Sequence, residues 1–258
     1  MIISIINHTS GKLTDEAVQH AIRAINTQIA EDFEPYWSMG ARLRLEGKAG
    51  TKPGPQTAAD LRGDAIIYLW DQEDVGDALG YHEKTNRGLP YGFVFTELAA
   101  RLKESWTVTL SHEALELIAD PEANLLVKGP NPHAPDRDVF FWYEMCDAVQ
   151  DEHYVVGDVP VSNFVLPLYF TGGEEKGGRN DFLGRPHDGR TLASFGVNPG
   201  GYVGFYDPET GTHETLTRPG DARAAERLKI KGRALEARRA SRYQRRAAGP
   251  PPVAKGRR

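Results

Sequence analysis

The segment Asp-Ala-Ile-Ile-Tyr-Leu-Trp at residues 64–70 is a nearly continuous apolar run, and it constrains the fold more than any other stretch. Such a run is typical of a strand in the middle of a sheet, where other parts of the chain cover both faces. A second apolar run, at residues 2–6, is followed by a turn-like cluster at 7–11 and predicts a buried first strand. Both runs therefore predict a sheet with buried strands.

Helices and further strands are predicted around these two runs. Thr14 is a typical helix N-cap, and apolar residues at helical spacing follow it, so we expect a helix that ends before Pro35. Residues 41–46 alternate apolar and basic side chains, as an exposed or half-buried strand does. Residues 79–95 predict a hairpin or a strand at a sheet edge. The sequence thus predicts an α+β fold in which a mixed, twisted sheet packs on helices.

Residues 111–121 contain the pattern H-E-x-x-E within a run of good helix formers, which Asp120 and the proline after it bring to an end. Residues four apart lie on the same helix face, so His112 and Glu116 can hold one ion, while Glu113 lies about a quarter turn away. This is the geometry of the H-E-x-x-H zinc motif, with glutamate replacing the second histidine. The alternative is an amphipathic helix with an ordinary solvated acidic edge.

Two further carboxylates lie in the apolar, aromatic stretch at residues 140–149, namely Glu144 and Asp147. A buried carboxylate without a counter-charge is costly, so carboxylates in such a stretch need a cation. A metal ion is one candidate for that cation. The other candidate is a buried ion pair with an arginine such as Arg137 or Arg179.

The order of these elements resembles the N-terminal half of the zincin metallopeptidases, which runs strand, helix, strand, strand, edge strand and metal helix. In the gluzincin group of that family, a glutamate on a second helix supplies the third ligand, often with an aspartate one turn beyond it. Here Glu144 follows Glu116 by 28 residues, and Asp147 lies three positions further on. The resemblance therefore implies a zincin-like fold with one metal centre.

The resemblance also implies a role for each candidate residue. The implied metal ligands are His112, Glu116 and Glu144. Glu113 would take a proton from the attacking water, and either Asp147 or Asp120 would fix the orientation of the histidine ring. Tyr202, or His82 on the edge-strand hairpin, would stabilise the oxyanion. Tyr202 also has a simpler interpretation as a core tyrosine in the strand expected at residues 200–207.

These roles together predict a metal-dependent hydrolase, a zinc metallopeptidase acting on peptide or protein substrates. One divalent ion is expected, with zinc first and manganese, iron or calcium as alternatives, because the glutamate of H-E-x-x-E adds negative charge and oxygen ligands. The competing prediction is a zincin-like protein without catalysis, with a structural or interaction role of the phage or mobile-element kind.

Charge divides the chain into two parts. Residues 221–258 contain 13 Lys/Arg against three Asp/Glu, whereas residues 1–220 contain 18 against 33. We therefore predict a zincin-like metal-binding domain over 1–220 and a basic tail over 221–258, helical and then disordered. A tail folded back on the acidic body or simply solvated is favoured over one that binds nucleic acid or an acidic partner, because no recognised nucleic-acid motif accompanies its charges and Tyr243 is the single aromatic residue among them.

The remaining sequence signals concern the compartment. Cys146 is the single cysteine, which excludes an internal disulfide and predicts a small buried side chain. The chain has neither a long apolar segment nor a basic stretch before its first apolar run. We therefore expect a cytoplasmic protein that does not enter the membrane.

Overall fold

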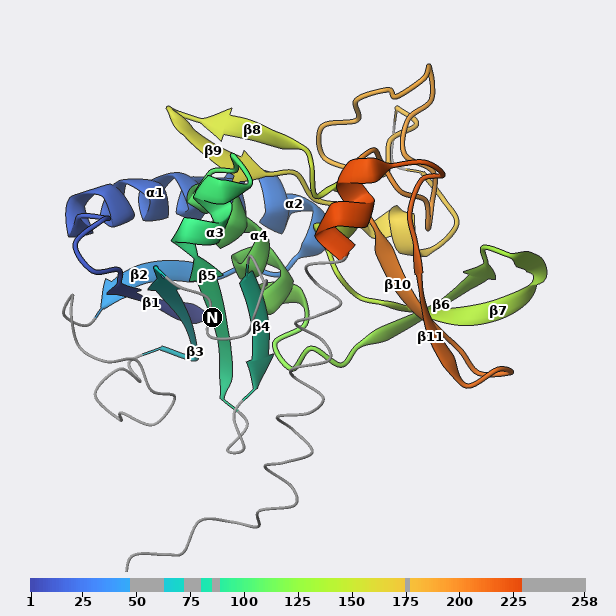
Figure 1. The fold of residues 1–258 in the computed structure, drawn as a ribbon, viewed down its shortest axis with the longest axis horizontal. Coiled ribbons are helices and arrows are strands. Elements are labelled where there is room, and N and C mark those ends of the chain that lie inside the picture. Colours follow the sequence, from blue (N-terminus) through green and yellow to red (C-terminus); the bar gives the residue numbers. More distant parts are fainter. Residues whose placement is uncertain (47–62, 72–79, 85–88, 175–176, 229–258) are drawn as a thin grey trace, which may run out of the picture.

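The computed structural model describes residues 1–46, 63–71, 80–84, 89–174 and 177–228, with only the backbone described for 80–84. Its larger sheet has the strand order β2-β1-β3-β5-β4 (Figure 1). The strands are β1 (Ile2–His8), β2 (Arg42–Glu46), β3 (Ala65–Trp70), β4 (Gly80–Lys84) and β5 (Pro90–Phe95). All neighbours pair in parallel except β4 and β5, which are antiparallel. The predicted mixed sheet is confirmed, with the 64–70 run as its central strand.

The first helical region is longer than the sequence predicts. Helix α1 (Asp15–Thr27) begins at Thr14, whose hydroxyl accepts the Ala17 N–H, and it continues through a π-helical turn, η1 (Gln28–Phe33), into α2 (Glu34–Trp37). The prediction that helical structure ends before Pro35 is wrong. Pro35 lies in the first turn of α2, directly after the π-helical turn, and proline is tolerated at the start of a helix.

Gln28, at the start of the π-helical turn, is fully buried and connects three elements. Its side-chain amide donates to the Ser162 carbonyl at 2.8 Å and accepts from the Ser111 hydroxyl at 2.6 Å. The Ser111 hydroxyl also accepts the Ser162 N–H at 3.1 Å. These bonds attach the π-helical turn to the segment that carries His112.

Replacing Gln28 by alanine is therefore expected to lower the free energy of unfolding by about 2 to 4 kcal/mol, because it leaves buried groups unpaired and opens a cavity. Gln19→Ala provides the matched control, since Gln19 is exposed on the preceding helix. Chemical denaturation of both variants checks this expectation. Equal stabilities of the two variants would contradict it.

Helix α4 (Trp106–Ala119) runs through the interior and contains the H-E-x-x-E pattern. Its N-cap is Ser105, whose hydroxyl accepts the Thr107 N–H, and α3 (Thr96–Arg101) precedes it. The helix packs against β4, β5, β9 and α3. Glu113 and Glu116 are only 5% and 3% exposed. A solvated acidic edge is thus excluded, and the helix places both carboxylates in the core.

A second, antiparallel sheet with the order β11-β10-β7-β6 lies beyond α4, on the right in Figure 1. Its strands are β6 (Leu126–Asn131), β7 (Ala134–Trp142), β10 (Val203–Asp207) and β11 (Thr212–Leu216). A separate hairpin joins β8 (His153–Val156) to β9 (Val159–Ser162).

The second helix implied for Glu144 is absent from this described region. Phe140, Phe141 and Trp142 belong to β7, which pairs with β6 and β10. Glu144 follows the strand without regular structure, and a short 3-10 turn, η3 (Asp147–Val149), comes next. Strand pairing of Phe140 and Phe141 therefore prevails over any helical tendency in this stretch.

The first residues of the predicted basic tail are packed on the body. Residues 222–228 are helical, and the Arg227 side chain is buried. The rest of the tail, 229–258, lies outside the described residues. Within the described part of the chain, none of the helices combines the length and apolarity that a membrane crossing requires.

Candidate metal centre

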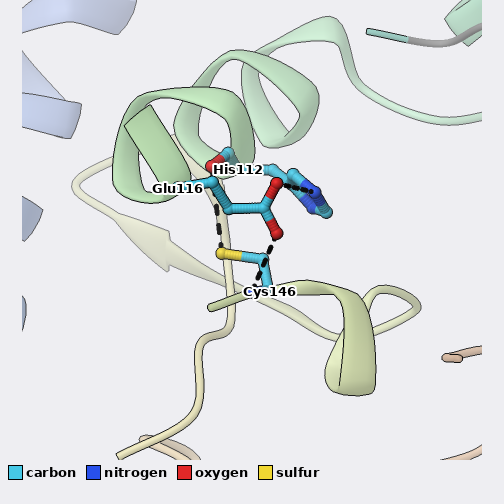
Figure 2. Close-up of side chains that lie close together, drawn as sticks. All are labelled: His112, Glu116 and Cys146. Carbon is cyan, nitrogen blue, oxygen red and sulfur yellow. Dashed lines mark hydrogen bonds and ion pairs between the residues drawn. The ribbon is translucent and has the colours of Figure 1, made fainter. Parts of the chain in front are cut away.

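The first half of the site is formed by α4. The imidazole of His112 and the carboxylate of Glu116, one helical turn apart, meet with 3.1 Å between Nε2 and Oε2. The other carboxylate oxygen of Glu116 accepts the Cys146 N–H at 3.2 Å. Glu116 thus connects the helix to the turn that follows β7, and Figure 2 shows the imidazole directed at its carboxylate.

The second half of the site comes from that turn. Asp147 is 3% exposed and places Oδ1 3.4 Å from Nε2 of His112. A carboxylate that only oriented the ring of a metal-bound histidine would contact the opposite nitrogen, Nδ1. Asp147 instead shares Nε2 with Glu116. The structure therefore places Asp147 on the side where a ligand would lie.

Two of the ligand-to-ligand distances match those around a bound metal ion. Around tetrahedral zinc, with bonds of about 2.0 to 2.1 Å, neighbouring ligand atoms lie about 3.3 Å apart. The distances from the His112 nitrogen to its two carboxylate neighbours are 3.1 and 3.4 Å. One imidazole nitrogen with carboxylate oxygens is also a donor set used by zinc, manganese and iron.

The buried carboxylates of the candidate centre need a compensating positive charge. Burial alone would lower the pKa of His112, but Glu116 and Asp147 outweigh that effect and hold the pKa well above its ordinary value. Glu113 contributes in the same direction. Several buried carboxylates thus surround one imidazole, and either a proton or a metal ion at Nε2 balances part of their charge.

Tyr202 contacts Asp147 twice. Its hydroxyl donates to Oδ1 of the carboxylate at 2.6 Å, and its backbone N–H donates to the Asp147 carbonyl at 3.0 Å. Burial, followed by the charge of Asp147, raises the pKa of Tyr202 well above its ordinary value. The phenol therefore remains a donor. It is directed at the carboxylate, which differs from the predicted role at a substrate oxyanion.

Cys146 is the residue that sequence reasoning assigned only to packing. Its sulfur forms, with His112 and Glu116, a buried group whose candidate ligand atoms all lie within 4.8 Å of one another. However, burial and the charge of Glu116 raise the pKa of the Cys146 thiol well above its usual value. The thiol also donates weakly to the His112 carbonyl at 3.9 Å. A metal ion would displace the proton of a thiol that it binds, so the Cys146 sulfur is a candidate third donor beside Asp147.

The other two predicted carboxylates are Glu144 and Asp120. Glu144 is half-buried between β7 and the turn, where its charge acts on Tyr202. Asp120 is the C-cap residue of α4, and its Oδ2 accepts the N–H groups of Asn124 and Leu125, both at 2.7 Å. Asp120 therefore supports the turn after the helix, and the predicted contact with the histidine ring is taken by other groups.

The remaining candidates from the sequence are Arg137, Arg179 and His82. Arg137 pairs with Asp207 and Glu209, and Arg179 donates to Tyr36 and to the Phe182 carbonyl, so their described contacts involve neither Glu144 nor Asp147. The side chain of His82 lies outside the described part of β4. Comparisons with protein-family models, with curated proteins and with solved structures found no match to this chain.

Proposed function

We propose that this protein is a metal-dependent hydrolase that acts on peptide bonds, with His112, Glu116 and Asp147 as its metal ligands. The observation that carries the proposal is the convergence of two buried carboxylates on Nε2 of one buried imidazole, at 3.1 and 3.4 Å. An ordinary ion pair needs one carboxylate for one imidazolium. The second carboxylate, together with Glu113 nearby, provides the excess of donors that a divalent ion requires.

When bound, a divalent ion supplies Lewis acidity toward water and toward a carbonyl oxygen. The residues of the chain have separate tasks around it. Glu113 follows His112 on the helix and serves as the general base that accepts a proton from water. Tyr202 holds one oxygen of Asp147 through its hydroxyl, and the Cys146 N–H holds one oxygen of Glu116. Both ligand carboxylates are thus fixed by a hydrogen bond from outside the ligand set.

The fold adds support of a second kind. The elements β1, α1, β2, β3, β4 and β5 precede α4, and β4 is the antiparallel strand at the sheet edge. This order resembles the one implied for zincins in part, because β5 and the short helix α3 lie between the edge strand and α4. The described ligands differ from the gluzincin pattern, since an aspartate in a turn takes the place of a glutamate on a helix.

Burial of the centre favours a second candidate, a zincin-like protein whose metal has a structural role. Structural sites are closed by protein ligands, whereas catalytic sites keep a position for water or substrate. His112, Glu113 and Asp147 are all buried. Metal without cleavage would support this second candidate over the hydrolase.

Elemental analysis of the purified protein tests the common basis of both candidates. We expect about one equivalent of divalent metal, and His112→Ala is expected to lose it. His153→Ala is the matched control, because His153 is exposed on β8. If His112→Ala retains as much metal as the control, the centre proposed here is wrong.

A further inference from the structure

The buried arginine of the C-terminal segment bonds to the parts of the chain that assemble the centre. Arg227 is 5% exposed, and its guanidinium donates to the Gly200 carbonyl at 2.9 Å and to Asp151 Oδ1 at 2.9 Å. It also pairs with Glu104. A guanidinium offers donors in a fixed planar fork, which suits it to hold several acceptors at once.

The three acceptors belong to three different segments. Glu104 directly precedes Ser105, the N-cap of α4. Asp151 lies just beyond the η3 turn that begins with Asp147. Gly200 lies in the loop that leads to Tyr202. Arg227 therefore joins the start of the metal helix to both elements of the Asp147–Tyr202 pair. Figure 1 shows the helix that contains it, in orange, between α4 and β10.

Gly200 is held by the C-terminal segment through both of its backbone polar groups. Its N–H donates to Asp221 Oδ2 at 2.6 Å, while its carbonyl accepts from Arg227. Its φ of +78° is a conformation that favours glycine, and a Cβ there would lie 2.5 Å from the Cβ of Asp151. This loop has little freedom to adopt another path while the C-terminal helix is in place.

The loop is in turn bonded to the turn that supplies the ligand. Asn198 N–H donates to the Ala148 carbonyl at 2.9 Å, and Tyr202 N–H donates to the Asp147 carbonyl at 3.0 Å. A Cβ on Gly201 would lie 2.3 Å from the Ala148 carbonyl oxygen, so the two backbones are in close contact. A shift of the loop would therefore move the Tyr202 hydroxyl relative to the Asp147 carboxylate.

We propose that Arg227 is a positioning residue of the metal centre, which acts through Gly200 and Tyr202 to fix Asp147 as a ligand. The inference rests on the proposed function, because it concerns the same metal. It gives a structural role to the start of the basic segment, which contains 13 Lys/Arg residues. The charge of Arg227 is balanced by Glu104 and Asp151 of the body. Metal affinity and ligand geometry thus depend on residues far from the H-E-x-x-E pattern.

Arg227→Gln and Arg223→Gln in the full chain form the test pair. Arg223 contacts the same Asp151, at 2.7 Å, and Glu104, but its side chain is 55% exposed. Affinity for Zn²⁺ is measured by competition with a chromogenic chelator. We expect Arg227→Gln to bind zinc about tenfold more weakly, as loss of an outer support does. Arg223→Gln is expected to stay within about twofold of the wild type.

The visible spectrum with Co²⁺ separates positioning from plain stability. A changed ligand geometry in Arg227→Gln alters the Co²⁺ absorption bands, whereas a variant that is merely less stable keeps the wild-type bands once folded. Asp221→Ala is the milder second variant, since it removes the bond to the Gly200 N–H from a more exposed position. We expect it to weaken zinc binding about threefold.

The positioning role is wrong if folded Arg227→Gln keeps the wild-type zinc affinity and the wild-type Co²⁺ bands. If Arg227→Gln does not fold, the same result in Asp221→Ala has the same meaning. Neither result would argue against the metal centre itself. A wild-type protein that binds neither Zn²⁺ nor Co²⁺ would overturn the proposed function together with this inference. The two failures are therefore distinguishable in one experiment.

Discussion

Asp147→Asn is expected to weaken binding of divalent metal by more than about a hundredfold, because it removes a charged ligand. Loss of a residue that only supports a ligand already costs about ten- to a hundredfold in metal affinity. Asparagine keeps the size of the side chain and can still accept the Tyr202 hydroxyl, so the change is confined to charge and ligand strength. Titration with Zn²⁺ against a competing chelator measures the effect.

Glu144→Gln is the matched control, since it removes a carboxylate from the same stretch. We expect its metal affinity to stay within about threefold of the wild type, because the ligand set proposed here does not include Glu144. If Glu144→Gln loses the metal while Asp147→Asn keeps it, the ligand set implied by the gluzincin resemblance is correct and the one proposed here is wrong.

Thermal unfolding of Asp147→Asn gives an independent signature. With chelator present, the variant is expected to be as stable as the wild type or more stable, because it carries one buried carboxylate fewer around His112. With metal at about a hundred times the wild-type Kd, binding raises the free energy of unfolding of the wild type by about 2.7 kcal/mol. The variant, which binds metal more weakly, gains much less. The order of the two unfolding temperatures is thus expected to reverse when metal is added.

The sheet and the helix that contains the H-E-x-x-E pattern were predictable because their signals are local. The runs at 2–6 and 64–70 are short and almost wholly apolar, and they became β1 and β3. The start of α1 at Thr14 follows from a hydroxyl and acidic residues before an amphipathic stretch. The edge hairpin of β4 and β5 also follows from alternation and turn residues.

The second half of the centre was not predictable from local signals. Glu144 and Asp147 are equivalent in type, and only three positions separate them. The choice between them depends on where β7 ends and on the loop that brings Tyr202 to Asp147 from 55 residues away. Likewise, no sequence feature distinguishes Arg227 from the other arginines of its segment. Its role arises from long-range packing, which a pattern of charges does not encode.

The glutamate of H-E-x-x-E has a structural consequence beyond its charge. A histidine at position 116 would present one ligand nitrogen to the metal. The Glu116 carboxylate instead places one oxygen at His112 and the other on the Cys146 N–H. It thereby holds the turn that contains Asp147, so the two carboxylates proposed as ligands depend on each other. Such an oxygen-rich set favours Mn²⁺ or Fe²⁺ more than a His-rich zinc site does.

The largest catalytic effect is expected at Glu113. It is buried on the helix beside His112, where its charge acts on both the imidazole and the Cys146 thiol. Glu113→Gln keeps the size of the side chain but cannot accept a proton at neutral pH, so we expect cleavage of a peptide library to fall about 10²- to 10⁴-fold. Metal content is expected to remain at the wild-type level, because Glu113 is outside the ligand set.

Glu122→Gln is the control for this experiment, since that carboxylate lies in the turn after α4, away from the centre. Mass spectrometry of the digested library reports the cleaved bonds, and elemental analysis of the same samples reports the metal. If Glu113→Gln and the wild type cleave the library equally, Glu113 is not the general base. If the metal-loaded wild type cleaves no bond, a structural role for the metal is favoured instead. A structural metal site is closed by protein ligands and leaves no position for substrate.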